Sequence, residues 1–284
     1  MSVLDGVIPE HPQRLVGPHL VPDAPVAPAS DAIHGIPIAI TDYDRALRFI
    51  DDAVATGERG YVCVSNVHTV MAAQEDAELR HALEASTFNV PDGMPLVWAL
   101  NLLGHSLQDR VYGPELMSRA AARAAENGQR FYLYGGRNQG ALVQLALNLR
   151  TRFPGIRIVG GYSPPHRPLT AAEEEQIAEE INATDADVVW VGIGVPKQEK
   201  WMARMRDRLD APMLIGVGAA FDFHAGLVPQ APPMLQRIGL EWAYRLVQEP
   251  RRLWRRYLCY NPRFVLALSR QVLAHRLGLA GARR

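Results

Sequence analysis

A single aspartate stands in a tight turn where a buried strand is expected to end. Asp92 lies between Pro91 and Gly93, directly after the apolar run Phe88–Val90. A carboxylate held at a strand end by such a turn can accept a proton from a substrate hydroxyl, which is the role of a general base. Asp and Gly are also ordinary turn residues, and Asp92 could instead cap the helix that follows. The pattern makes Asp92 a candidate catalytic residue.

Positive charge and glycine turns that suit a phosphate group follow other apolar runs. Arg110 precedes a Gly-Pro pair that opens a helix, a place where a guanidinium can neutralise a phosphate. Glycines let the backbone approach a ligand, and helix starts beside them offer amide groups. The first glycine turn contains Gly135 and Gly136. The second contains Gly192 and Gly194, followed in the sequence by Lys197, Gln198 and Lys200, and the third contains Gly216 and Gly218, followed by Asp222.

A polar cluster also follows the apolar run at Tyr61–Ser65. Asn66 and His68 stand there at the start of a helix, where an amide and an imidazole could hold a polar ligand. Helix capping by Ser65 or Asn66, with His68 on the helix flank, explains the same residues more simply.

Several common catalytic motifs are absent from the sequence. There is no P-loop pattern, no G-x-G-x-x-G and no G-x-S-x-G, which disfavours an NTPase, a nicotinamide dehydrogenase and a hydrolase with a nucleophile elbow. No Cys/His pair shows zinc spacing. Two D-x-D pairs, Asp42/Asp44 and Asp185/Asp187, stand at a helix start and before a strand, so we interpret both as structural.

An alternation of short apolar runs with helical patterns positions these groups. Hydroxyl-x-x-carboxylate patterns at Thr41–Asp44 and Thr170–Glu173 predict capping boxes at two helix starts. Near-continuous apolar runs are typical of strands covered on both faces. The predicted fold is therefore α/β, a Rossmann-like and mostly parallel sheet flanked by helices, with an arginine-rich helical appendage at the C-terminal end. The expected strands are Tyr61–Ser65, Phe88–Val90, Arg130–Tyr134, Ile156–Val159, Asp187–Ile193 and Met213–Val217.

Composition narrows the class of protein. The chain has 284 residues and 48% hydrophobic residues, which predicts one globular domain with a modest appendage. No uncharged apolar run is long enough to cross a bilayer as a helix. The first thirty residues lack a secretory signal pattern, and two cysteines, Cys63 and Cys259, imply no disulfide scaffold, so we expect a cytoplasmic protein.

Proline and charge divide the chain into three parts. Six prolines fall in the first thirty residues, and residues 1–33 are expected to be a flexible leader. Residues 34–233 are the expected catalytic domain, and residues 234–284 the basic appendage. From Arg237 onward there are eleven arginines and two glutamates. The equal totals of 30 Lys+Arg and 30 Asp+Glu therefore combine a positively charged C-terminal part with a negatively charged body.

Two chemically different faces are expected on the helix after Pro250. A cationic face beside an apolar, aromatic one is typical of a helix lying on an anionic membrane surface. Alternatively, the apolar face packs on the body and the arginines are simply solvated. At about 100° per residue, one face carries Arg251, Arg252, Arg255 and Arg256, and the other Leu253, Trp254, Tyr257 and Leu258.

Taken together, these clusters resemble the WecG/TagA/CpsF glycosyltransferases, glycosyltransferase family 26, over about residues 35–264. The resemblance implies a hexosyltransferase of cell-surface or exopolysaccharide biosynthesis at the inner face of the membrane. It would move N-acetylmannosamine, its uronic acid or glucose from a UDP-sugar to a polyprenyl-diphosphate-linked saccharide, with inversion; no cofactor and no metal ion is expected. The matching motifs are Ser65-Asn66, Pro91-Asp92-Gly93, Arg110-Val-x-Gly113, Tyr134-Gly135-Gly136, Gly194–Trp201, Gly216–Phe223, Gly239–Arg245 and Glu249–Arg252.

The resemblance also implies roles for single residues. Asp92 matches the family's proposed general base, and Arg110 and Gln198 match polar residues beside it; these three form the expected catalytic set. Many members have a threonine two residues before the pocket asparagine, where this chain has Val64, which puts a hydroxyl role there in doubt. The expected substrate-binding residues are Asn66, His68, Gly135, Gly136, Gly194, Lys197, Gly218 and Asp222, with Arg245, Arg252 and Arg255 gripping the diphosphate.

Two other kinds of function remain open from the sequence. A nucleotide-sugar-binding regulator would share the pocket without transfer activity. An RNA- or DNA-binding module could use the arginines of the appendage, but the apolar face beside them favours lipid, so no nucleic-acid partner is expected. A site completed by a C-terminal segment is compatible with a homo-oligomer. The sequence does not determine the sugar donor or the acceptor saccharide.

Overall fold

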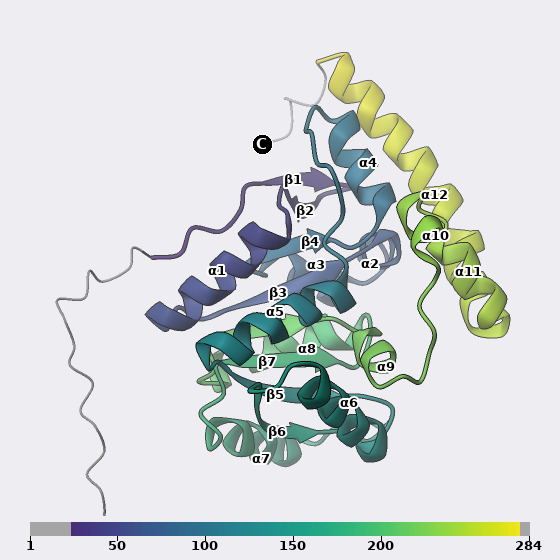
Figure 1. The fold of residues 1–284 in the computed structure, drawn as a ribbon. Coiled ribbons are helices and arrows are strands. Elements are labelled where there is room, and N and C mark those ends of the chain that lie inside the picture. Colours follow the sequence, from purple (N-terminus) through teal and green to yellow (C-terminus); the bar gives the residue numbers. More distant parts are fainter. Residues whose placement is uncertain (1–23, 279–284) are drawn as a thin grey trace, which may run out of the picture.

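A six-stranded parallel sheet forms the centre of the molecule (Figure 1). The computed structural model describes residues 24–278, without the side chains of residues 233, 252, 255 and 256. The strand order is β4-β3-β8-β7-β5-β6, and every neighbouring pair is parallel, as the sequence predicts. The strands are β3 (Gly60–Ser65), β4 (Phe88–Pro91), β5 (Arg130–Gly135), β6 (Arg157–Tyr162), β7 (Val188–Gly192) and β8 (Met213–Gly216).

Helices cover both faces of this sheet. Alternate residues of β3 point to opposite sides, so that Val62 and Val64 join one buried cluster while Tyr61 and Cys63 join the other. The first cluster contains α1 (Tyr43–Thr56), α5 (Gly113–Asn127), α6 (Gln139–Arg152) and part of α9 (Ala220–His224). The second contains α2 (Val67–Ala72), α3 (Ala77–Glu84), α4 (Met94–Leu102), α7 (Ala171–Asn182) and α8 (Lys197–Met205), which the short helix η1 (Arg206–Arg208) follows.

A small antiparallel hairpin precedes α1 and was not expected. Strands β1 (Ser30–Ile33) and β2 (Ile36–Ala39) pair with each other. Ile33, Ile36 and Ile38 are buried in the second cluster, and burial of their apolar side chains explains why this segment folds. The leader predicted over residues 1–33 therefore ends before Ser30, and residues 1–23 of it lie outside the described part of the chain.

The two predicted helix starts have different outcomes. Thr170 and Glu173 form the expected capping box at α7. At α1 the prediction is wrong, because Asp42 is the N-cap and accepts a hydrogen bond from the Arg45 amide at 2.9 Å. The Thr41 hydroxyl instead donates to the carbonyl of Asp42.

The appendage consists of three helices that lie along one side of the body (Figure 1). They are α10 (Pro233–Arg237), α11 (Glu241–Gln248) and α12 (Pro250–Arg276). Helix α12 packs against α2, and its Phe264 is buried in the second cluster. Gln271 donates a hydrogen bond to the carbonyl of Ala32 at 2.6 Å and accepts one from the His34 amide at 3.1 Å. The appendage is thus tied to the hairpin near the other end of the described chain.

The apolar side of α12 is divided rather than continuous. Leu253 and Tyr257 are buried, Tyr257 beside the ring of Trp242 on α11, whereas Trp254 and Leu258, expected on the same face, are exposed. Further along the helix Val265 is also exposed. At about 100° per residue, these three exposed side chains fall within about 40° of one another. In residues 24–278 no helix is long and apolar enough to span a membrane.

Candidate active site

One large cavity opens at the carboxyl ends of the strands. Its volume is about 1180 Å³, and it is lined by the turns after β3, β4, β5, β7 and β8 together with residues of α4, α11 and α12. Ligands of open parallel sheets bind at this edge, where turns from several strands converge. The polar clusters found in the sequence are therefore brought together in one place.

Asp92 lines this cavity and does not cap the helix that follows it. The N-cap of α4 is Gly93, with no side-chain hydrogen bond, so the capping alternative is wrong. Burial raises the pKa of Asp92 to about 7, although Arg110 and the amide of Gly113 act in the opposite direction. Its Oδ1 atom is buried and has no hydrogen-bond partner among the described residues. Such a carboxyl group can take up a proton at neutral pH.

Arg110 lies beside Asp92 but its side chain is held by the appendage. Its Nη2 atom is 2.7 Å from Oε2 of Glu241 and donates to Oε1 of Gln236 at 3.0 Å. The guanidinium also lies 4.1 Å from the centre of the Tyr112 ring. The side chain of Arg110 is only 10% exposed, so these contacts pair a positive charge that is largely removed from water.

Gln198 presents an oriented hydrogen-bond acceptor. It is the second residue of α8, is 1% exposed, and donates through Nε2 to Oε1 of Glu199 at 2.8 Å. In this arrangement the amide NH₂ of Gln198 faces Glu199 and its carbonyl oxygen faces away. That Oε1 atom is buried without a partner among the described residues, close to the turn at Gly218.

Asn66 and His68 line the cavity and also serve the helix that carries them. Asn66 is the N-cap of α2, and its Oδ1 accepts from the amides of His68 at 3.0 Å and Thr69 at 3.3 Å. The capping role considered for Asn66 is therefore confirmed. The His68 ring packs 5.3 Å from the ring of Tyr260 on α12, which joins the body to the appendage.

The glycine turns divide into packing and open positions. Gly135 does not line the cavity. A Cβ atom at this position would come within 2.5 Å of the Gly192 carbonyl, so the glycine allows two strands to approach closely. Gly136 lines the cavity, but its amide already donates to Gly192 at 3.1 Å, so it is not the phosphate donor suggested by its sequence. Gly194 and Gly218 both line the cavity with positive φ angles.

Charged residues complete the opposite wall. Asp222 forms an ion pair with Arg137, with Nε to Oδ1 at 3.0 Å and Nη2 to Oδ2 at 3.2 Å. Lys197 is exposed at the cavity edge, and Arg245 lines the cavity with its Nε buried and without a partner among the described residues. The side chains of Arg252 and Arg255 lie outside the described residues, although their backbone belongs to α12.

Sequence analysis did not assign roles to three side chains at this site: Glu241, Gln236 and Arg137. Glu241 lies in the motif Gly239–Arg245 on which the resemblance rests, so the signal was present. Its contact with Arg110 joins residues more than a hundred positions apart, which local patterns cannot reveal.

The structural interpretation of the two D-x-D pairs is confirmed. Asp42 caps α1, and Asp187 binds Arg130 with Nη2 to Oδ1 at 2.9 Å, far from the cavity edge of the sheet. Within the described residues there is no group of three His, Cys, Asp or Glu side chains that could hold a metal ion.

The fold defines an α/β protein with a cavity, lined by carboxylates and cations, at the carboxyl edge of a parallel sheet. The family model for the glycosyl transferase WecG/TagA/CpsF family matches residues 32–278. The chain belongs to this family and is a glycosyltransferase.

Two curated relatives carry the same name, N-acetylglucosaminyldiphosphoundecaprenol N-acetyl-beta-D-mannosaminyltransferase. The protein from Bacillus spizizenii is 30% identical over 208 residues, covering 73% of this chain and 78% of the relative. The protein from Bacillus subtilis is 28% identical over 243 residues, covering 85% of this chain and 92% of the relative. Both are thus similar to this chain over most of its length.

Proposed function

We propose that this glycosyltransferase moves a sugar from a UDP-sugar to a saccharide carried on a polyprenyl diphosphate, with inversion at the anomeric carbon. The observation that carries the proposal is Asp92, which lines a cavity that also contains Arg245 and whose Oδ1 atom is buried without a partner among the described residues. Inverting transfer needs one base for the acceptor hydroxyl and positive charge for the departing diphosphate.

Asp92 takes the proton of the acceptor hydroxyl as that oxygen forms a bond to the anomeric carbon. The bond between that carbon and the UDP oxygen breaks, and UDP leaves with the electron pair. Arg245 lies within reach of this cavity and supplies positive charge for the leaving group. Gln198 directs a carbonyl oxygen at a hydroxyl or N–H group of the bound sugar.

N-Acetylmannosamine is the donor sugar we favour, and an N-acetylglucosaminyl diphosphate lipid is the acceptor. Both choices come from the names of the two relatives, which describe transfer of N-acetylmannosamine to such a lipid. The uronic acid of N-acetylmannosamine and glucose are the other donors to be compared.

The exposed stripe on α12, formed by Trp254, Leu258 and Val265, supports a place at an anionic membrane surface on the cytoplasmic side. Their exposed fractions are 46%, 59% and 61%. Apolar side chains along a helix that also carries arginines are typical of elements that lie at a lipid interface. An acceptor attached to a polyprenyl chain would be met at such a surface.

The test is a transfer assay with a panel of UDP-sugars and a polyprenyl-diphosphate acceptor. We expect UDP release and a product whose mass exceeds that of the acceptor by one N-acetylhexosamine residue. UDP binding without transfer to any acceptor would favour the regulator. Tight, salt-sensitive RNA binding with no affinity for anionic vesicles would favour the nucleic-acid module.

A further inference from the structure

Glu241 is a buried carboxylate that the appendage places inside the active site. It is the first residue of α11 and is 9% exposed. Its Oε2 atom lies 2.7 Å from Nη2 of Arg110, and Gln236 of α10 accepts from the same nitrogen. Two side chains of the appendage therefore converge on one arginine of the body.

The charges around Asp92 come from both the body and the appendage. Arg110 and Arg245 are positive, and Glu241 is negative, so one of the two cations that would hold Asp92 ionised, Arg110, is set against a second carboxylate. A cation already paired at short distance exerts a weaker field on its other neighbours, particularly where water is scarce. The described ionisable groups that face Asp92 are Arg110, Arg245, Glu241, Tyr43 and Tyr112.

We propose that Glu241 is a positioning residue, which docks the appendage on Arg110 and offsets that arginine's charge so that Asp92 remains an effective proton acceptor. This rests on the proposed function of Asp92 as the base. Without Glu241, two arginines would face one carboxylate. Asp92 would then hold its proton more weakly and would be a poorer base.

The first experiment compares pH profiles of kcat/KM for the full-length enzyme and its Glu241→Gln variant. Glutamine keeps the size and a hydrogen-bonding oxygen but removes the charge. We expect the acidic limb of the profile to move to lower pH by about one pH unit, with a lower maximal rate. Glu241→Asp, which keeps the charge, should restore the position of the limb. An unchanged limb in Glu241→Gln would overturn the proposal.

A matched control separates this effect from the loss of any buried ion pair. Asp187→Asn also removes a carboxylate from an arginine, Arg130, but at the other edge of the sheet. It should lower the free energy of unfolding and leave the acidic limb in place. If Asp187→Asn moved the limb as far as Glu241→Gln, the shift would reflect general destabilisation and the proposal would fail.

A second measurement does not depend on activity. The difference in free energy of unfolding between the protein and its Asp92→Asn variant is measured against pH, with Glu241 present and with Glu241→Gln. Burial raises the pKa of Asp92 from 3.8 to about 7, so its contribution falls as pH rises between these values. With Glu241→Gln that fall should end at lower pH. Equal end points would overturn the proposal, whereas a protein inactive on every acceptor would refute only the proposed function.

Discussion

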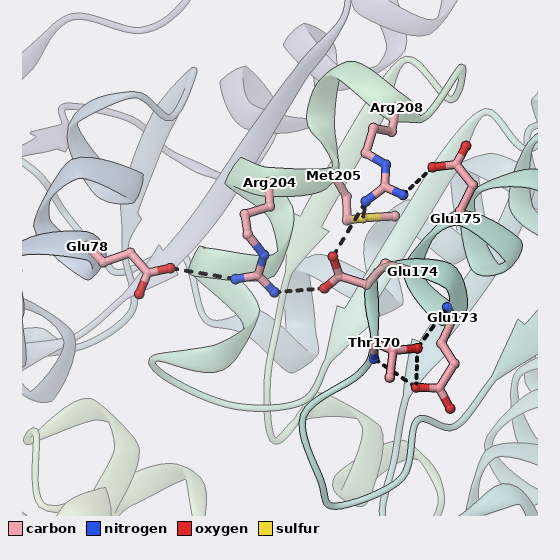
Figure 2. A network of polar contacts seen from close by, with 8 residues as sticks. All are labelled: Glu78, Thr170, Glu173, Glu174, Glu175, Arg204, Met205 and Arg208. Atoms are coloured by element: carbon pink, nitrogen blue, oxygen red, sulfur yellow. Dashed lines mark hydrogen bonds and ion pairs between the residues drawn. The ribbon is translucent and has the colours of Figure 1, made fainter.

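Two groups of ion pairs in this enzyme occupy opposite environments. Between α3, α7 and the end of α8, Arg204 lies between Glu78 and Glu174, and Arg208 lies between Glu174 and Glu175 (Figure 2). Most of these side chains are at least 30% exposed. Beside Asp92, by contrast, Arg110 and Glu241 are almost fully enclosed.

The two groups differ in how fully their charges are paired, although Glu78, Glu174 and Arg204 line the same cavity as Asp92. In the network of Figure 2, Arg204 and Arg208 each meet two carboxylates, and water screens what remains. In the candidate site an oxygen of Asp92 and a nitrogen of Arg245 are buried without partners among the described residues. Unpaired polar atoms in a buried place are costly for folding and are expected where a substrate is to bind.

The largest effect should come from Asp92→Asn, which removes the proposed base and keeps the shape of the side chain. We expect kcat/KM to fall by about 10²–10⁴-fold, in the range of general-base catalysis. In the unmodified enzyme the rate should rise with pH through about 7, where burial places the pKa of Asp92. Full turnover by the variant would show that the buried cluster is no more functional than the exposed network.

Arg245→Ala tests whether the unpartnered nitrogen awaits a phosphate. We expect kcat to fall by about 10²-fold, the usual loss when one donor to a developing negative charge is removed. Arg237→Ala removes an exposed arginine of the same appendage and is the control. Equal losses in the two variants would mean that the total charge of the appendage matters rather than its place in the site. Steady-state kinetics with the donor and acceptor varied separately gives the answer.

Leu258→Asp on the exposed stripe of α12 should weaken attachment to lipid. Burying one leucine side chain contributes roughly 1.5–3 kcal/mol, so affinity for vesicles containing anionic phospholipid should fall by about tenfold or more. Val143→Asp, on a half-exposed apolar residue of α6, is the matched control and should bind like the unmodified protein. Co-sedimentation measures both, and unchanged binding of Leu258→Asp would separate the stripe from membrane attachment.

The smallest effect should come from Glu175→Gln in the exposed network. Its partner Arg208 keeps Glu174, and water surrounds the pair, so the free energy of unfolding should change by about 1 kcal/mol or less. The change should shrink further at high salt. Urea denaturation at two salt concentrations measures this, and a loss of several kcal/mol would break the distinction between the two groups.

The sequence predicted the sheet well because its strands are buried on both faces. Continuous apolar runs such as Val188–Gly192 are visible without tertiary information, and all six expected strands are present. The hairpin before α1 was missed because β1 begins with Ser-Asp and its pairing depends on burial of the isoleucines behind it. Gly135 was assigned to ligand binding although its lack of a side chain is needed for contact with β7.

The site was predicted in part, and the reasons differ between residues. Asp92 follows β4 and Gln198 begins α8, and these elements converge at one edge of the sheet, so their common cavity followed from topology. The contact of Glu241 and Gln236 with Arg110 could not be predicted in this way, because both residues belong to a segment whose docking is decided by packing. The split apolar side of α12 has the same cause: Phe264 is fixed in the core, and this orients every other side chain of the helix.

The contact between Gln271 and the hairpin limits the order in which the enzyme can fold during its synthesis. β1 and β2 are synthesised long before α12, so these two segments can meet only after Gln271 has left the ribosome. Asp92 is synthesised long before Glu241 and Arg245 arrive beside it. Chains whose synthesis has not passed α11 therefore lack two charged side chains of the proposed site, Glu241 and Arg245.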